Sequence, residues 1–313
     1  MWNIKPSINK CFDCFTGLVV SFCEYHNISY EKCFLQPWGF FISDVINGNV
    51  VDNIKLCNSN SFFSNLEDFY GLKIEQRNIS TMTELKGYIS NNIAMMPIII
   101  NIDAYDCIWC EIYQKYHFSH YVMIVDSSNN SVLASDSYFP IDAYRKIQYS
   151  DIRLLTDSVY SLHFDKTELG EVSVNKKIKE IICFMEEHNI LCNIKKLMEI
   201  FIAPNALRRE TDNYGDNFQY SPIFLLLKRF ADDRQCYAMA LETINNNVFK
   251  DSIISFNKTN KLYLNLVNVI FKGIIIGDIN LEKIENLFHK IFAQENESLQ
   301  LLKNTIQKDE IPI

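Results

Sequence analysis

Glycine and proline are scarce in this chain of 313 residues, which has 9 and 7 of them, and no glycine-rich phosphate loop is present. Nucleotide binding therefore has no support. No apolar run approaches the roughly 20 residues of a membrane-spanning helix, and residues 1–6 lack the basic and apolar regions of a signal peptide. Internal repeats and long heptad runs are also absent. We expect a folded cytoplasmic protein that does not enter a membrane.

Clusters of basic residues are scarce as well. The chain carries 30 Lys and Arg against 38 Asp and Glu, a formal net charge of −8, and its longest basic cluster is Arg208-Arg209. Binding to nucleic acid needs many cationic contacts, so we expect no nucleic-acid partner. Apolar residues make up 48% of the chain, which is enough to bury an ordinary core.

Cysteine, in contrast, is plentiful, with ten residues. In a chain without a secretory signal these predict free thiols in a reducing compartment. Two pairs, Cys11-x-x-Cys14 and Cys107-x-x-Cys110, have the spacing of a redox dithiol or of half a zinc site, and His117 and His120 follow the second pair. The pairs lie over ninety residues apart and neither is in a glycine-rich knuckle, so we predict no metal. An inhibitory disulfide between Cys11 and Cys14 is an alternative under oxidation.

Cys14 has the surroundings of a nucleophile. Asp13 is a good N-cap, and apolar residues then recur at helical spacing, which predicts a helix over residues 14–26. The thiol would lie in the first turn, where unpaired backbone N–H groups and the helix dipole favour a thiolate. The alternative is that Cys14 is a small buried core residue.

His120 and Asp136 are the best-placed partners for this thiol. Residues 120–125 read as a strand, 126–130 as a turn, and 131–135 as the return strand that ends at Asp136. The carboxylate could then hold one imidazole nitrogen while the other faces the sulfur. Alternatively, His120 is structural and Asp136 is a turn residue. The order cysteine, histidine, acid favours a catalytic triad.

The chain changes character near residue 165. Before it, helix signals at 14–26, 29–35 and 81–91 alternate with strand signals at 97–103, 120–125, 131–135 and 159–164. After it, helical periodicity extends over 173–188, 189–202, 221–245, 260–276 and 281–303, with breaks at Pro204 and in the polar stretch 211–215. That stretch is either a surface connection or a loop over the active site. We predict an α+β protein, with an α/β domain at 1–165 and a helical domain at 166–313.

These motifs resemble a known family. Asp13-Cys14 with Leu18, Phe22 and Tyr25-His26-Asn27 is similar to the nucleophile helix of bacteriocin-processing cysteine peptidases. The segments 101–105, 120–126 and Asp136 extend the resemblance to the N-terminal domain of the butirosin biosynthesis protein H family, over about residues 7–165. The resemblance implies a papain-like fold, with Cys14 as nucleophile, His120 as base and Asp136 as the orienting acid.

The chain departs from the family pattern at three places. Phe15 replaces the usual glycine after the nucleophile, which narrows the space beside the sulfur and puts bulky or protein substrates in doubt. Ser137 replaces the usual proline after the acid. The related peptidases place a glutamine before the cysteine as oxyanion donor, and Asn9 could supply that amide here, together with the Cys14 backbone N–H.

The resemblance implies acyl transfer: an acyl group passes from a carrier-protein thioester through Cys14 to an amine acceptor, forming an amide in natural-product (antibiotic) biosynthesis. A related cysteine-protease homologue acts in closthioamide biosynthesis. The implied partners are an acyl or peptidyl carrier protein and a small-molecule amine. No cofactor is implied beyond the carrier's phosphopantetheine. The alternatives are a cysteine peptidase or amidohydrolase that uses water, and a papain-like domain that only binds.

Two further expectations follow from amide formation. Aminolysis must compete with hydrolysis, and aromatic walls could exclude water, although the sequence favours ordinary core for each of these side chains. The aromatic residues in question are Phe15, Trp38, Phe40, Phe41 and Trp109. An acidic carrier would need a basic patch on this acidic chain. Its candidates, which could equally be solvated helix faces, are Lys195-Lys196, Arg208-Arg209, Lys228-Arg229 and Arg234.

Overall fold

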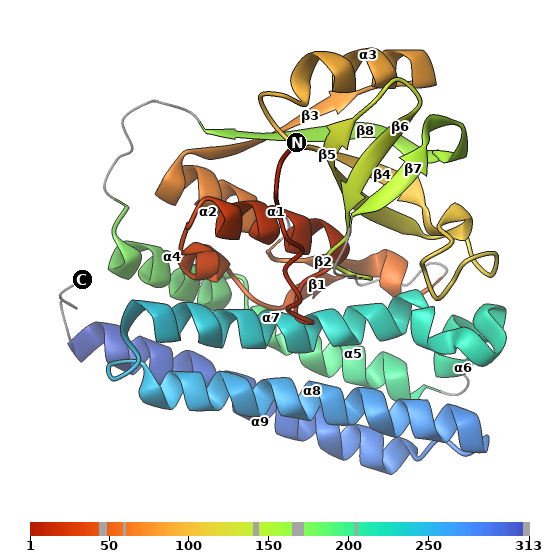
Figure 1. Cartoon of the computed structure of the whole chain (residues 1–313). Coiled ribbons are helices and arrows are strands. Elements are labelled where there is room, and N and C mark those ends of the chain that lie inside the picture. Colours follow the sequence, from red (N-terminus) through yellow and green to blue (C-terminus); the bar gives the residue numbers. More distant parts are fainter. Residues whose placement is uncertain (44–48, 59–60, 140–143, 165–171, 204–205, 309–313) are drawn as a thin grey trace. The chain divides into compact units, whose positions relative to one another are not determined.

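The computed structural model describes residues 1–43, 49–58, 61–139, 144–164, 172–203 and 206–308 (Figure 1). It is an α+β protein, as predicted. The chain forms two compact units, Met1–Tyr30 with Leu66–Gly170, and Glu31–Asn65 with Glu171–Ile313. The predicted break at Pro204 and the predicted boundary at 165–166 lie outside the described residues.

A six-stranded antiparallel sheet forms the centre of the first unit. Its strand order is β3-β8-β4-β5-β6-β7, so β4 and β5 are interior strands. All six residues of β4 are buried, because both faces of this strand are covered. The strands are β3 (Leu72–Asn78), β4 (Ile98–Asp103), β5 (Ser119–Ser127), β6 (Ser131–Ser135), β7 (Arg145–Gln148) and β8 (Leu154–Phe164).

Two helices flank this sheet on opposite sides, α1 (Cys14–Tyr25) and α3 (Met82–Asn92) (Figure 1). α3 begins with a capping box formed by Thr81 and Glu84. α1 packs against β5, and eight of its residues are buried. Gly17 permits a close approach here, because a Cβ atom at this position would lie 2.6 Å from the Ser137 Oγ. The helix start is thereby held beside the segment that follows β6.

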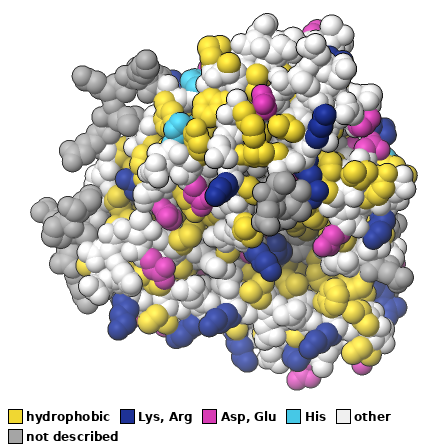
Figure 2. Space-filling view, viewed as in Figure 1, with side chains coloured by type: hydrophobic (Ala, Val, Ile, Leu, Met, Phe, Trp, Pro, Cys, Tyr) yellow, Lys and Arg dark blue, Asp and Glu magenta, His cyan; other side chains and the backbone are white. Residues whose placement is uncertain are grey.

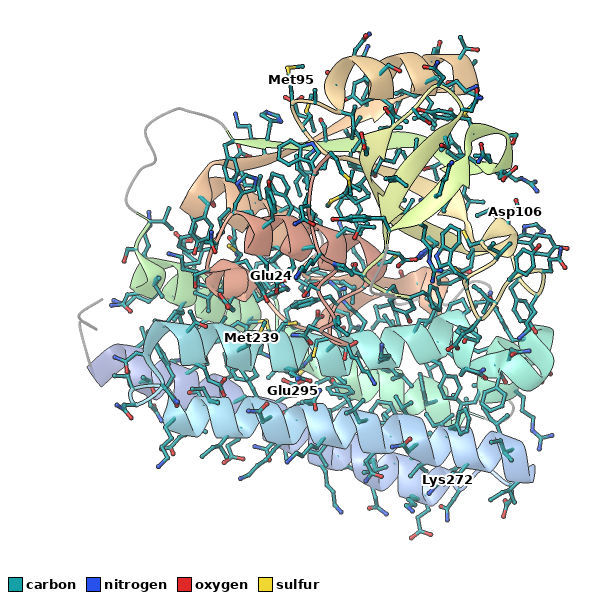
Figure 3. All side chains as sticks on the ribbon, viewed as in Figure 1. Glu24, Met95, Asp106, Met239, Lys272 and Glu295 are labelled. Carbon is teal, nitrogen blue, oxygen red and sulfur yellow. The ribbon has the colours of Figure 1, made fainter. Side chains whose placement is uncertain are left out.

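The second unit is mainly helical. Its long helices α7, α8 and α9 follow one another through short turns, so sequence neighbours pack together. Gly277 ends α8 in the left-handed conformation at φ +79°, and the Asn280 side chain then accepts the Lys283 N–H at 2.8 Å. In Figure 3, Glu295 of α9 points into these helices and Lys272 of α8 points away. The helices are α4 (Val174–Glu187), α5 (Asn193–Ile202), α6 (Ala206–Thr211), α7 (Pro222–Asn245), α8 (Lys250–Ile276) and α9 (Leu281–Lys308).

Residues 31–65 belong to the second unit although they precede most of the first. They contain the 3-10 helix η1 (Tyr30–Phe34), the strand pair β1 (Phe40–Ile42) and β2 (Ile54–Leu56), and part of α2 (Ser61–Tyr70). Phe40 stacks on Phe230 of α7 with ring centroids 4.7 Å apart. The predicted division into 1–165 and 166–313 does not include this discontinuity, and as a statement about domains it stays a prediction.

One local prediction is wrong. Residues 211–215 were expected to be a loop, but the structure places most of this stretch in the 3-10 helix η6 (Asp212–Tyr220). A kink at Gly215, with φ +49°, interrupts it, and a polar sequence with glycine tolerates such short tight turns. In the part of the chain that the structure describes, no helix combines the length and the apolar character needed to cross a bilayer.

Candidate active site

Cys14 begins α1, as the sequence predicts. The Asp13 side chain accepts the backbone N–H of Thr16 at 2.7 Å, which caps the helix and fixes its first residue. The thiol is half-buried and accepts hydrogen bonds from the backbone N–H groups of Phe15 and Tyr121. Tyr121 pairs with Asn101 of β4, whereas the pairing of β5 with β6 begins only at Met123. The sulfur therefore lies where β5 emerges beyond its neighbour.

The surroundings of Cys14 do not favour a thiolate, which corrects the expectation from its place in the helix. Burial, the charge of Asp13 and, more weakly, the charge of Asp136 raise the pKa of the Cys14 thiol to about 12, although the two backbone N–H groups act in the opposite direction. The helix N-terminus is thus outweighed by desolvation and by two carboxylates. Cys14 rests as a neutral thiol, and its use as a nucleophile requires a base.

His120 and Asp136 form a buried pair at the end of the sheet. His120 Nε2 lies 2.7 Å from Asp136 Oδ2, and the two side chains are 2% and 1% exposed. β5 and β6 bring them together, since one residue belongs to β5 and the other directly follows β6. The prediction that Asp136 holds one imidazole nitrogen is consistent with this geometry.

Four N–H groups converge on the Asp136 carboxylate. Oδ2 accepts from His120 and, at 2.7 Å, from the indole Nε1 of Trp109, while Oδ1 accepts the backbone N–H groups of Tyr138 and Phe139. Burial alone would raise the pKa of Asp136, but its bond to His120 and these other donors hold the pKa below its ordinary value. The carboxylate is ionised and rigidly placed.

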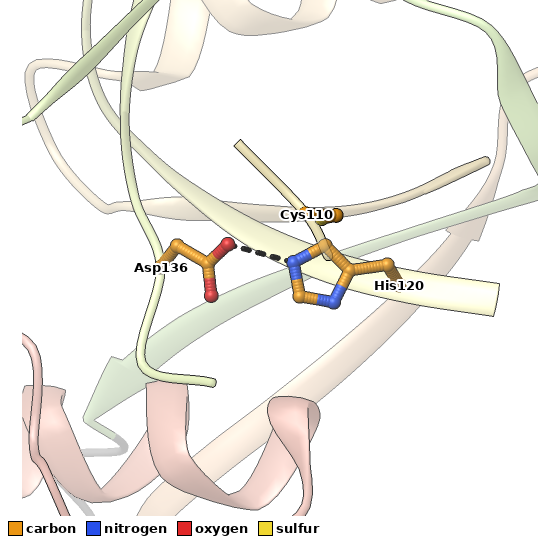
Figure 4. Close-up of side chains that lie close together, drawn as sticks. All are labelled: Cys110, His120 and Asp136. Atoms are coloured by element: carbon orange, nitrogen blue, oxygen red, sulfur yellow. Dashed lines mark hydrogen bonds and ion pairs between the residues drawn. The ribbon is translucent and has the colours of Figure 1, made fainter. Parts of the chain in front are cut away.

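The remaining imidazole nitrogen can act as a base. In the tautomer whose Nε2 donates to the carboxylate, Nδ1 carries no proton and can accept one. In Figure 4, Nδ1 points to the side on which α1 lies. Ser137 Oγ donates to the Cys14 carbonyl at 3.4 Å, which ties the segment after Asp136 to the start of that helix. Among the described residues, the hydrogen bonds of the Cys14 sulfur go to backbone N–H groups, not to the imidazole.

Phe15 borders the sulfur as part of an aromatic cluster. Its ring lies edge-to-face against Tyr121 and Tyr160, with centroids 4.9 and 4.8 Å apart. Such edge-to-face pairs stabilise the position of the ring by more than its burial alone would. The Phe15 side chain is therefore held by Tyr121 and Tyr160, and Tyr121 in turn lies near the Cys14 thiol. Together with Trp109, Phe15 is one of the predicted wall residues that lie with the site.

The other predicted wall residues lie in the second unit, where each contacts aromatic side chains of that unit. Trp38 donates its indole N–H to Glu295 Oε2 at 2.9 Å and packs against Tyr237 and Phe256. Phe40 stacks on Phe230, and Phe41 contacts Phe184 and His188. These contacts agree with the alternative that Trp38 and Phe40 are ordinary core, whereas the Phe41 side chain is only half-buried.

Asn9 precedes the helix and holds the turn before it. Its Oδ1 accepts the Cys11 backbone N–H at 3.1 Å, and its carbonyl accepts the N–H of Phe12 at 3.2 Å. The side-chain oxygen thus shapes the approach to Cys14. The role of the Asn9 amide as an oxyanion donor stays a prediction.

The second cysteine pair lies beside the acid and the base, and the sequence had already placed its Cys-x-x-Cys spacing shortly before His120. Cys110, His120 and Asp136 are buried with their reactive atoms within 4.8 Å of one another. The hydrogen bond that the Cys110 thiol donates to Cys107, together with burial, raises the pKa of the Cys110 thiol. His117, in contrast, turns away: its Nδ1 lies 2.7 Å from Asp103 Oδ2. In the sequence, the short Cys-x-x-Cys spacing was the signal that Cys107 and Cys110 lie together.

Of the residues considered for a basic patch, Arg234 is fully buried and bound to Glu295, so it cannot receive a carrier. Arg229 pairs with Asp233 at 3.0 Å. The face in Figure 2 shows basic side chains over its helical part mixed with acidic and apolar ones. A carrier surface on the remaining candidates stays a prediction.

A scan of the chain against protein-family models found no match, and a search of curated proteins found none either. Function must therefore be inferred from the chemistry of this site.

Proposed function

We propose that this protein is a papain-like thiol acyltransferase that forms an amide from a carrier-bound thioester. The observation that carries the proposal is the placement of a half-buried thiol at the start of α1, beside a buried imidazole–carboxylate pair whose free nitrogen points to the side of that helix. A thiol with a raised pKa beside an imidazole whose Nδ1 can accept a proton suits general-base activation.

In the first step, His120 Nδ1 takes the proton of Cys14 as the sulfur attacks the carrier thioester. The phosphopantetheine thiol leaves with that proton, and Cys14 holds the acyl group as a new thioester. The exchange is nearly balanced in energy, because one thioester replaces another. Asp136 stabilises the imidazolium that forms between these events, since it is ionised and hydrogen-bonded to Nε2.

In the second step, an amine attacks the Cys14 thioester and loses a proton to His120, and the thiol is regenerated. Water competes for the same intermediate, as it would in a peptidase or amidohydrolase. The aromatic cluster of Phe15, Tyr121 and Tyr160 limits the space open to bulk water on one side of the sulfur. A small amine acceptor is favoured over a protein for the same reason.

The test is incubation of the protein with an acyl-pantetheine thioester, followed by intact-mass and peptide mapping. One acyl group is expected on Cys14, and Cys14→Ala should abolish it. His120→Ala should slow its formation by roughly 10²–10⁴-fold, the usual contribution of a general base. Cys183→Ser is the matched control, because Cys183 is exposed and lies in α4.

Addition of a panel of small amines then separates the candidate reactions. Faster discharge by an amine than by buffer, with an amide as product, supports acyl transfer. Discharge by water alone supports a hydrolase. An adduct confined to cysteines other than Cys14, or none, would remove the proposed nucleophile and favour a binding role.

A further inference from the structure

Three buried side chains, one of them the proposed catalytic base His120, lie close together, and a fourth adjoins them. Reactive atoms of Cys110, His120 and Asp136 lie within 4.8 Å of one another. Figure 4 shows these three side chains and the bond between His120 and Asp136. The Cys107 thiol is hydrogen-bonded to the Cys110 thiol, and Cys107 is 3% exposed. Cys107 thus adds a second thiol beside the group formed by Cys110, His120 and Asp136, and its own thiol donates to the Asp103 carbonyl at 3.4 Å. We call these four residues the thiol–imidazole–carboxylate cluster.

We propose that this cluster binds one Zn²⁺ ion and that the bound ion switches off the catalytic base. Zinc takes four ligands in tetrahedral geometry and accepts thiolate sulfur, imidazole nitrogen and carboxylate oxygen. Two sulfur ligands select against magnesium and calcium, which prefer oxygen. The proposal differs from the expectation, based on sequence alone, that the chain has no metal site.

The surroundings of Asp136 suit a ligand role. Tyr138 and Phe139 fix Oδ1 through their backbone N–H groups, and Trp109 holds Oδ2 from the side. Such outer hydrogen bonds orient metal ligands. Cys107 and Cys110 are joined by a turn in which the Cys110 N–H donates to the Cys107 carbonyl at 2.9 Å, so both thiols come from one short segment.

Binding would change the protonation of His120. Nε2, which now donates to Asp136, must give up its proton to bind the ion, and that proton moves to Nδ1 through solvent. The two thiols each release one proton, so one Zn²⁺ replaces two protons while the imidazole stays neutral. Nδ1 then carries a proton and cannot accept that of Cys14. This inhibitory consequence rests on the proposed function, whereas metal binding does not.

Metal binding is tested with the full chain, reduced and stripped with a chelator, by titration with Co²⁺ and then Zn²⁺. One equivalent of Co²⁺ should give the intense visible bands of a tetrahedral site and a sulfur-to-cobalt charge-transfer band, and Zn²⁺ should remove both. About two protons should be released per metal in weakly buffered solution, as the balance above requires. Cys107→Ser and Cys110→Ser should weaken Co²⁺ binding at least tenfold, whereas Cys14→Ser and Cys183→Ser should not.

Inhibition is read separately, as acylation of Cys14 with and without one equivalent of Zn²⁺. With Zn²⁺ added, the wild type should lose acylation of Cys14, and Cys107→Ser should keep it. Cys107→Ala and circular dichroism check that the serine variant is folded.

The metal site would be overturned if no tetrahedral cobalt spectrum appeared, or if Co²⁺ binding were unchanged in both Cys107→Ser and Cys110→Ser. The metal site would also be overturned if reduced Cys107 and Cys110 bound no metal and only formed a disulfide bond with each other on treatment with glutathione disulfide. A metal-free protein that never acylates would overturn the proposed function and leave the site intact.

Discussion

Asp13 acts on Cys14 in two opposing ways. Its side chain caps α1 and so places the sulfur at the helix start. Its charge is also the second cause, after burial, of the raised pKa of the thiol. A residue that helps to position a nucleophile therefore also holds that nucleophile in its unreactive form. This makes proton removal by His120 the step on which the proposed chemistry depends.

Substitution of Asp13 separates the two effects. Asp13→Asn keeps the cap, because asparagine caps helices as well as aspartate does, so stability should change by less than about 1 kcal/mol. Loss of the charge should lower the pKa of Cys14 and raise its rate of alkylation by iodoacetamide at pH 8. In both proteins the rate should climb about tenfold per pH unit between pH 7 and 10, because the thiolate is the reactive form and the pKa of about 12 lies above this range.

Peptide mass spectrometry gives the rate at Cys14 alone. Asp151→Asn serves as the control, because Asp151 is also an exposed carboxylate of the first unit. An unchanged alkylation rate in Asp13→Asn would mean that Asp13 does not control the thiol. A plateau below pH 8 in the wild type would show a thiolate–imidazolium pair in the resting enzyme.

At the residue scale, sequence reasoning identified the buried His120–Asp136 pair and the place of Cys14, because a strand, a tight turn and a return strand bring their ends together. It could not foresee the environment of the thiol. The pKa depends on burial and on Asp136, which is over a hundred residues away. The donor role of Trp109 and the approach of Cys110 to His120 depend equally on how the segment after β4 folds back.

At the scale of elements, the segments with strong apolar periodicity were the ones that the sequence predicted correctly. The predicted helices at 173–188 and 221–245 correspond to α4 and α7, and the strand predicted at 131–135 is β6. β3 and β7 were not predicted, because their outward faces are polar and they lie at the two edges of the sheet. Edge strands bury less, so their sequences carry a weaker signal.

The helices of the second unit contain a buried ion pair whose loss should be costly. Arg234 of α7 and Glu295 of α9 are fully buried, with Nε 2.7 Å from Oε1. Glu295→Gln would leave a buried guanidinium without its counter-charge, so unfolding free energy in urea should fall by about 3–5 kcal/mol. The exposed pair Lys176 and Glu180 gives the control, and Glu180→Gln should change stability by less than about 0.5 kcal/mol.

A double variant shows whether the unpaired charge of Arg234 causes the loss of stability expected in Glu295→Gln. Arg234→Met with Glu295→Met removes both charges and should recover much of the lost stability, because an apolar pair can replace a buried ion pair. A loss below 1 kcal/mol in Glu295→Gln would mean that water or another group compensates the guanidinium. Failure of the double variant to recover would assign the cost to lost packing and to the Trp38 hydrogen bond.

At the scale of the whole molecule, the order of the chain and the division into units do not coincide. Residues 31–65 lie between α1 and the strands of the first unit in the sequence, yet they pack with the helices that follow residue 171. The change in apolar periodicity near residue 165 marks where one helix begins to follow another. It does not show that residues 31–65 pack with those helices. Contacts such as that of Trp38 with Glu295 join residues more than 250 positions apart.

A fragment tests this division. Residues 1–165 expressed alone keep Trp38 and Phe40 but lose Glu295, Tyr237 and Phe230, which enclose them. The exposed apolar surface should make the fragment bind a hydrophobic dye, aggregate on size exclusion and be cleaved first within 31–65 by a protease. Co-expression with 166–313 should suppress all three, because it returns the missing partners. A monomeric fragment that resists cleavage in this segment would instead show that residues 1–165 fold without the helices, and the boundary predicted from sequence would then hold.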